Sequence, residues 1–118
     1  MAVLNESLDT IFIGEDISIV YTLTARSDPT SWALKATYIP ISGTSAVLTT
    51  AAGTVAISGV TGSGTSWSAT VTVTITSAKT ALFSACLGGW QVHRTDTGSA
   101  ELLGEGTVPM QLPRATIP

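Results

Sequence analysis

The side chains that could support catalysis are few, and nothing in the sequence requires them to meet. His93 is the only histidine, Cys86 is the only cysteine, and Asp96 is the acid nearest to His93. A nucleophilic triad needs a base, a carboxylate and a Ser or Cys side chain in contact. His93 follows Val92 in an alternating segment, so we expect it on the solvent side, opposite the face of Trp90. We therefore expect no catalytic residues and no enzymatic activity.

The residues that could bind a metal ion are equally sparse. Glu15 and Asp16 form a carboxylate pair, but Ca²⁺ takes six to eight oxygen ligands, and no further acids follow at the spacing of a calcium loop. The pair is typical of a solvated strand entry that discourages edge pairing. The lone Cys86 cannot form an intrachain disulfide or a zinc cluster, and we interpret it as a small buried apolar residue. We expect neither a metal nor a cofactor.

A glycine-rich segment, Gly59 to Gly64, superficially resembles a phosphate-binding loop. Such a loop connects a strand to a helix, whose N-terminus binds the anion. The residues after Ser66 alternate as a strand instead. Residues 60–65 are therefore predicted to form a loop or a wide hairpin turn.

The composition limits the classes of partner. The chain has 118 residues and a mass of 12.1 kDa, enough for one domain. Charged residues make up only 11%, whereas Thr and Ser together account for 33 of the 118 residues. The net charge is -3, and the five basic residues are scattered, so we expect no nucleic-acid partner. No apolar run is long enough to cross a bilayer, and the N-terminus does not resemble a signal peptide, so we expect no membrane partner.

Alternation of apolar and polar residues is the dominant pattern and predicts β-strands. The clearest strands are predicted at residues 16–25, 32–38 and 66–76, where one face is apolar and the other mostly carries hydroxyl groups. Further strands are predicted at residues 10–13, 46–50, 54–58, 90–94 and 100–112. Gly104 and Gly106 predict a bulge or bend in the last of these.

One segment has helical rather than alternating spacing. Ala78, Ala81, Leu82 and Phe83 would lie close together on a helix, and Ser77 is a suitable N-cap. We predict one or two helical turns that cross from one sheet to the other.

These elements predict an all-β fold, an immunoglobulin-like antiparallel β-sandwich of about seven to eight strands with one short helical crossover near residues 77–84. The sandwich should span residues 10–112, with tails at residues 1–9 and 113–118. Trp32, Trp67 and Trp90 are expected between the sheets, in place of the disulfide of antibody domains. The full predicted core is Ile17, Ile19, Tyr21, Leu23, Trp32, Leu34, Trp67, Val71, Val73, Ile75, Leu82, Trp90 and Val92.

The uncharged polar faces favour an assembly function. Burial of unpaired charge is costly, so a hydroxyl-rich surface with few charges can be covered by a neighbour, or can present an edge for strand addition. We expect protein–protein contacts, with the protein as a homo-oligomer or in repeated copies. The candidate contacts lie in the tails and on apolar positions near the strand ends: Leu4, Phe12, Tyr38, Leu112, Pro113 and Ile117.

A second function stays open. Aromatic rings can stack on sugars, and Tyr38 beside Pro40 is the aromatic residue most expected to be exposed. A carbohydrate- or host-surface-binding module using Tyr38 and residues 60–65 is therefore the alternative.

The order of these features is similar to a known family. Gly14-Glu15-Asp16 enters the alternating strand, Gly89-Trp90-Gln91-Val92-His93-Arg94 forms a later one, and Asp96-Thr97-Gly98 turns the chain into a final strand with Leu103-Gly104-Glu105-Gly106. Over residues 10–112 the chain resembles the small immunoglobulin-like modules of tailed bacteriophages, particularly the N-terminal domain of the baseplate upper protein family.

The resemblance implies a non-enzymatic structural protein of the virion, made in the bacterial cytoplasm, whose partners are other capsid, tail or baseplate proteins. In that family the module attaches a larger receptor-binding apparatus. No coiled coil or second domain is expected after this sandwich, which favours an accessory part such as a capsid decoration or tail-surface protein.

Overall fold

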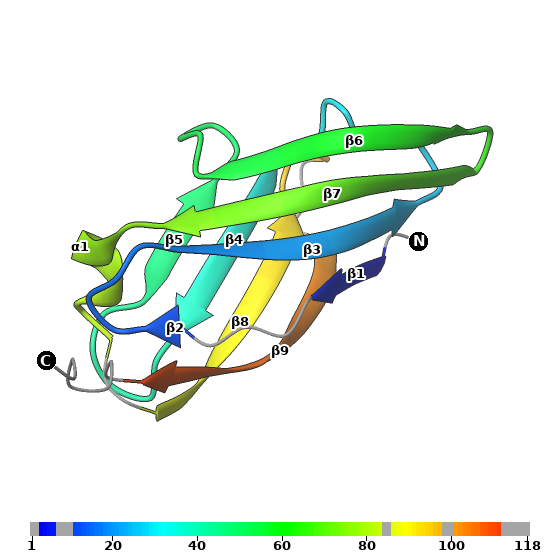
Figure 1. Ribbon diagram of the computed structural model, residues 1–118. Coiled ribbons are helices and arrows are strands. Elements are labelled where there is room, and N and C mark those ends of the chain that lie inside the picture. The colour runs from blue at the N-terminus through cyan, green and yellow to red at the C-terminus, as the bar shows by residue number, and fades with distance from the viewer. Residues whose placement is uncertain (1–2, 7–10, 84–85, 98–100, 112–118) are drawn as a thin grey trace, which may run out of the picture.

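The computed structural model describes residues 3–6, 11–83, 86–97 and 101–111, and over these ranges the chain forms nine strands and one short helix (Figure 1). The elements in chain order are β1 (Val3–Glu6), β2 (Ile11–Phe12), β3 (Ile17–Ala25), β4 (Leu34–Ile39), β5 (Ala46–Thr49), β6 (Val55–Ser63), β7 (Ser66–Ile75), α1 (Ser77–Thr80), β8 (Cys86–Arg94) and β9 (Glu101–Gln111). The prediction of an all-β fold with one short helical crossover is confirmed.

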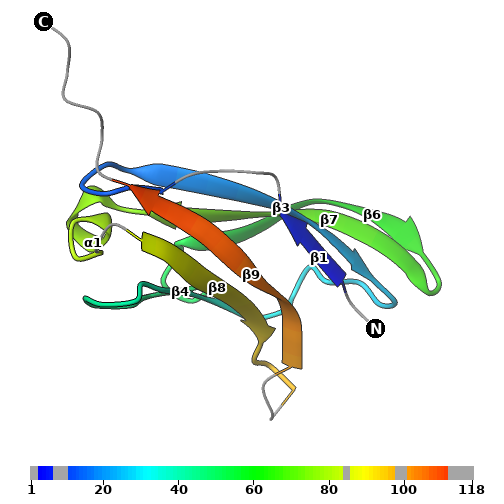
Figure 2. The same cartoon turned by 90° about the horizontal axis from the view of Figure 1, so that it is seen from below.

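The strands form two sheets that lie as two layers (Figures 1 and 2). Sheet A has the order β1-β3-β7-β6, and sheet B has the order β2-β9-β8-β4-β5. All neighbouring strands are antiparallel except β2, which runs parallel to β9. The helix α1 connects β7 of sheet A to β8 of sheet B, as the helical spacing predicted.

The core lies between the sheets and follows the alternation of the strands. Ile19, Tyr21 and Leu23 of β3 are fully buried, whereas the residues between them are exposed. The ring of Tyr21 contacts Trp90 of sheet B, with the ring centroids 5.0 Å apart. The predicted core residues that are buried are Ile19, Tyr21, Leu23, Trp32, Leu34, Val71, Val73, Ile75, Trp90 and Val92.

Three predicted core residues lie elsewhere. Ile17 and Trp67 are only half-buried and pack against the rim of the core. The prediction for Leu82 is wrong, because its side chain is 53% exposed and Phe83 is buried in its place. The helix ends at Thr80 after a single turn, so the helical spacing does not extend to Leu82. Phe83 forms an isolated β-bridge with Gly43 and is 5% exposed.

Three boundaries also differ from the prediction. Residues 3–6 are not part of a tail, because β1 pairs with β3 and extends sheet A by one strand. Trp32 precedes β4 instead of lying in it. The N-cap of α1 is Thr76, one residue before the predicted Ser77, and it makes no capping side-chain hydrogen bond. Four residues are too few to show alternation, which explains why β1 was not predicted.

The hairpin between β6 and β7 is longer and tighter than predicted. Most of the predicted loop at residues 60–65 belongs to β6, and only Gly64 and Thr65 form the turn. Gly64 has a φ of +59°, which suits the first turn position of a two-residue type II′ hairpin. A bulge lies in β6 between Ser58 and Thr61, where Gly59 has a positive φ of 60°. The bulge predicted in the last strand is present: the pairing with β8 shifts beside Gly104.

Candidate interaction surface

The outward side of sheet A carries mostly hydroxyl groups, with Val20 and Ala56 as apolar residues among them. We call this surface the hydroxyl face; it consists of Ser18, Thr22 and Thr24 of β3, Ser68, Thr70, Thr72 and Thr74 of β7, and Ser58 and Thr61 of β6. The register places Thr22, Thr70 and Ser58 in one row across the three strands. Because Thr is β-branched, it suits a pleated surface and brings a methyl group beside each hydroxyl.

Three of the four strands of sheet A contain no charged residue. None of β3, β6 and β7 contains Asp, Glu, Lys or Arg. Sheet B by contrast carries Lys35, Arg94, Glu101 and Glu105. A neighbour can therefore cover the hydroxyl face without desolvating a charge, which is the costly step in forming an interface.

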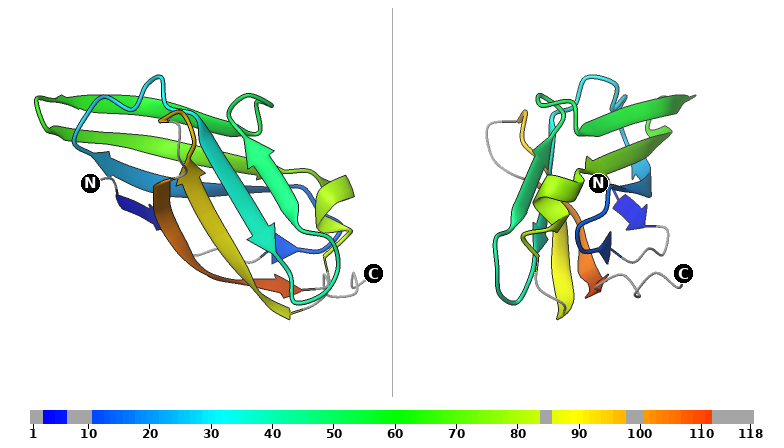
Figure 3. Two further views of the ribbon diagram at one scale, coloured as in Figure 1. Left: turned by 180° about the vertical axis from the view of Figure 1, so that it is seen from behind. Right: turned by 60° about the vertical axis from the view of Figure 1, so that its left-hand side comes forward.

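The four outer strands of the sheets differ in how well their free edges are protected. β2 is two residues long, and β1 and β5 are four each. The edge of β5 is also partly covered, because Nζ of Lys79 donates to the carbonyl of Val47 at 3.2 Å. β6 is nine residues long, ends the order of sheet A and contains neither charge nor proline. It forms the rim of the sheet opposite β1 (Figures 1 and 3). Proteins normally protect such an edge with charges, prolines, bulges or covering segments. The bulge between Ser58 and Thr61 interrupts the β6 edge, and the regular part before it, residues 55–58, contains no charge and no proline.

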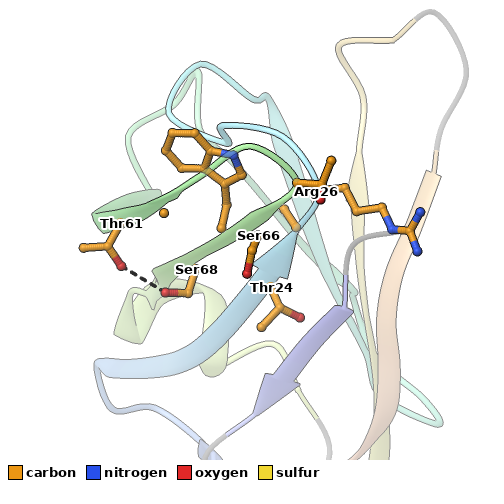
Figure 4. Close-up of a pocket in the computed structure, with 9 residues that line it drawn as sticks. Thr24, Arg26, Thr61, Ser66 and Ser68 are labelled. Carbon is orange, nitrogen blue, oxygen red and sulfur yellow. Dashed lines mark hydrogen bonds between the residues drawn. The ribbon is translucent and has the colours of Figure 1, made fainter.

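A hollow of about 510 Å³ lies near the tip of the β6–β7 hairpin. Its lining comes from β3 and the residue after it and from the hairpin, and is mostly hydroxyl and backbone (Figure 4). Thr61 and Ser68 form a hydrogen bond across the strands at 3.1 Å, and Nε1 of Trp67 donates to the carbonyl of Gly64 at 2.9 Å. Arg26 extends away from the labelled hydroxyl groups (Figure 4). The hollow therefore offers neutral donors and acceptors, with one cation at its margin.

A smaller hollow of about 330 Å³ lies on sheet B. It forms where Gly89 and Gly106 leave space beside Ile39, Gln91 and Glu105. Trp90 is also among the lining residues. Its Nε1 is buried and has no hydrogen-bond partner in the described part of the chain. The glycine at position 106 makes room for this indole, since a Cβ there would lie 2.8 Å from Nε1.

The residues considered for catalysis do not come together. Cys86 and His93 are seven residues apart on the same extended strand, β8, so about 23 Å separates their Cα atoms. Sγ of Cys86 instead lies 3.9 Å from Sδ of Met110. His93 is half-buried and pairs with Lys35 on β4 and Leu102 on β9. No nucleophilic triad can form from these residues.

Asp96 is held by Arg94. Nε of Arg94 donates to Oδ1 of Asp96 at 2.8 Å, and a second guanidinium nitrogen donates to Oδ2 at 3.1 Å. These hydrogen bonds lower the pKa of Asp96 below its ordinary value and raise the pKa of Arg94. The guanidinium also lies 3.9 Å from the ring centroid of Trp32, a cation–π contact. The three residues form a structural cluster that joins the end of β8 to the segment before β4.

The Asp16 carboxylate and the Glu15 backbone carbonyl anchor the helix. Oδ1 of Asp16 accepts a hydrogen bond from the amide of Ser77 at 2.6 Å. The buried hydroxyl of Thr80 donates to the carbonyl of Glu15 at 2.8 Å and accepts from the amide of Gly14 at 3.0 Å. Within the described ranges, no group of three or more His, Cys, Asp or Glu side chains could hold a metal ion. Positions 15 and 16 thus serve the crossover.

The candidate assembly contacts have mixed outcomes. Phe12 is 40% exposed on β2, at the edge of sheet B. The prediction of an exposed Tyr38 is wrong: its ring is fully buried, and its hydroxyl bonds to that of Tyr21 across the two sheets. Leu4 lies in β1, but its side chain is not described. Leu112, Pro113 and Ile117 lie outside the described residues.

Sequence reasoning identified the hydroxyl face but missed the features that distinguish the strand edges. Tyr38 alternates with Leu34 and Ala36, both apolar, and this phase was a signal for its burial. No comparable signal marks Lys79 as the residue that covers β5, because the two segments are far apart in the sequence. The length of β6 was hidden by its glycines, which predict loops more often than strands.

Comparison of the sequence with models of known protein families and with curated proteins gave no match. Within the part of the chain that the structure describes, no helix has the length and hydrophobicity needed to span a membrane.

Proposed function

We propose that this protein is a non-enzymatic structural module that acts through protein–protein assembly, and that it belongs to the virion of a tailed bacteriophage as an accessory component of the capsid, tail or baseplate surface. The assembly role is supported by one observation above the others. The three adjacent strands β3, β7 and β6 carry no charge and present a hydroxyl face that ends at a nine-residue free edge.

The virion assignment is supported by the resemblance to phage modules, and the strand order supports the immunoglobulin-like part of that resemblance. Sheet A corresponds to the A-B-E-D order of an immunoglobulin domain. In sheet B, β9-β8-β4 corresponds to G-F-C, with β5 added beyond C and β2 beside G. We infer an immunoglobulin-like sandwich whose inter-sheet contact between Tyr21 and Trp90 takes the place of a disulfide.

The test is the location of the protein in phage particles. Particles would be purified on a density gradient, analysed by mass spectrometry and labelled with an antibody against this chain for electron microscopy. We expect the protein to sediment with the particles in many copies and to label one structural part. Absence from the particles, together with failure of the purified chain to bind capsid, tail or baseplate proteins, would contradict the proposal.

The hollow near the hairpin tip supports a second candidate function, a carbohydrate- or host-surface-binding module. Its neutral hydroxyls and backbone groups are suited to sugar hydroxyls, and Trp67 lies in its lining. Tyr38 has no part in this candidate, because it is buried. Titration calorimetry against neutral oligosaccharides tests it: saturable heat that disappears in Trp67→Ala but persists in Trp32→Phe would favour sugar binding, and no heat would exclude it.

A further inference from the structure

The free edge of β6 has backbone groups that point away from its own sheet. The amide of Thr74 donates to the carbonyl of Thr54 at 2.8 Å, which fixes the phase of the ladder between β6 and β7. Because antiparallel ladders alternate, the backbone groups of Ala56 face β7, and those of Val55 and Ile57 face outward. Among the described residues, no other segment bonds to these outward groups.

From these observations we propose that two copies of this protein pair antiparallel through β6, so that sheet A continues from one copy into the other. This inference rests on the proposed assembly function and names the partner and the edge that it uses. The four-stranded sheets of the two copies would form one eight-stranded sheet, and its uncharged outer face would continue across the joint.

The lack of charge at the β6 edge allows a second copy to bind there. Each chain carries a net charge of -3, so two copies repel each other except where the contact itself is free of charge. The β6 edge meets that condition, since neither β6 nor the neighbouring β7 contains a charged residue. A different partner would normally be selected by complementary charge, for which this edge offers no group. A two-fold contact also requires a self-complementary surface, which an antiparallel strand pair provides.

The outward groups select one register. In one register, Ala56 lies opposite Ala56 of the partner subunit. Val55 then pairs with Ile57 of the partner subunit, and Ile57 pairs with Val55 of the partner subunit. The outward backbone groups of both residues are thus hydrogen-bonded in each copy. If Val55 instead of Ala56 lay on the two-fold axis of the pair, Gly53 would lie opposite Ile57. Gly53 is in a turn and has a φ of +79°. If Ile57 lay on the axis, Gly59, at the bulge, would lie opposite Val55. The regular segment before the bulge therefore favours the register centred on Ala56.

Disulfide trapping tests both the pairing and the register. In a Cys86→Ser background, Ala56→Cys places the two new thiols at a non-hydrogen-bonded antiparallel pair, whose Cα separation of about 4.5 Å suits a disulfide. Ser58→Cys is the matched control on the same strand and face. In the same register the two residues at position 58 lie about 13 Å apart, too far for a disulfide. A second control, Val47→Cys, is on the exposed surface of β5.

We expect the Ala56→Cys protein to form a covalent dimer under mild oxidation, at least tenfold faster than the Ser58→Cys or Val47→Cys protein. Equal rates for all three, or a monomeric Ala56→Cys protein, would overturn the inference. Faster trapping of Ser58→Cys than Ala56→Cys would overturn the register. Circular dichroism of each variant checks that the fold is retained, as expected because all three positions are exposed.

A charge variant gives an independent measurement on the chain without new cysteines. Ala56→Lys would place two ammonium groups opposite each other at the centre of the joint and should abolish the concentration-dependent dimer in sedimentation velocity. Thr74→Lys, on the same face but on β7, should leave it unchanged. A dimer that survives Ala56→Lys would overturn the inference.

The outcomes separate this inference from the proposed function. If the protein is found in phage particles but Ala56→Cys does not crosslink, the edge pairing fails and the assembly function stands. If Ala56→Cys crosslinks in the expected register but the protein is absent from particles, the pairing stands and the virion function fails.

Discussion

Gly106 is the position where one added methyl group has the most readily calculated effect. It lies opposite Trp90 in the pairing of β9 with β8. A Cβ at position 106 would lie 2.8 Å from Nε1 of Trp90, 3.2 Å from Cε2 and 3.3 Å from Cζ2. Trp90 is only 5% exposed, and its indole also contacts the ring of Tyr21. It has little room to move, so Gly106→Ala should strain the contact between the sheets.

The size of the effect follows from two opposing contributions. Overpacking of a core by a methyl group costs about 1–3 kcal/mol, and replacing Gly by Ala lowers the entropy of the unfolded chain, which restores about 0.4–1 kcal/mol. The free energy of unfolding should therefore fall by about 1–2 kcal/mol. For a domain of this size that corresponds to a decrease in Tm of about 4–8 °C.

Gly89 supplies the matched control on the neighbouring strand. A Cβ there would have Gly106 O as its nearest neighbour, at 3.8 Å, an ordinary contact. Gly89→Ala should leave the stability unchanged or raise it by up to about 1 kcal/mol. Thermal and urea unfolding followed by tryptophan fluorescence measures both variants. If Gly106→Ala is as stable as Gly89→Ala, the close packing of the indole against β9 is wrong.

Three further predictions concern the helix and the ion pair. Thr80→Val removes a buried hydroxyl that makes two backbone hydrogen bonds and should destabilise the fold by about 1–3 kcal/mol in urea unfolding; Thr80→Ser, which keeps the hydroxyl, should lose clearly less. Phe83→Ala should lower the free energy of unfolding by about 3–5 kcal/mol, and Leu82→Ala should lower it by less than about 0.5 kcal/mol. Equal decreases for the two variants would contradict the burial of Phe83. The hydrogen bonds from Arg94 lower the pKa of Asp96 in the folded protein. The ionised Asp96 therefore stabilises the fold at pH values above the ordinary carboxyl pKa of about 3.9. This stabilisation is lost as the pH falls through the lowered pKa of the folded state. Asp96→Asn should therefore lower the Tm near pH 7 and not at the lowest pH of a melting series, and a deficit independent of pH would refute this linkage.

The strands could be predicted from the sequence wherever alternation extends over several residues. β3 and β7 have near-perfect alternation because one side of each faces the core and the other faces outward, and both were predicted within one residue at each end. Their hydroxyl face follows from the same pattern.

The errors occur where the backbone departs from a regular period. The single helical turn ends before Leu82, so the next residue, Phe83, enters the core instead. β6 contains a bulge and two glycines, Gly59 and Gly62, which predict a loop instead of a strand. β1 is too short to carry a pattern, and only its pairing with β3 makes it a strand.

The amino-acid sequence by itself determined which residues can lie in water and which cannot, because side-chain polarity and a two-residue period are local properties. It thereby determined two sheets with an apolar interior and an outer surface of neutral hydroxyls. Only the tertiary structure decided which strands are at the rim and what covers them. Lys79 reaches Val47 from a segment 32 residues away, whereas the outward groups of Val55 and Ile57 have no such cover among the described residues. Edge protection depends on contacts between distant segments, and no local pattern encodes them.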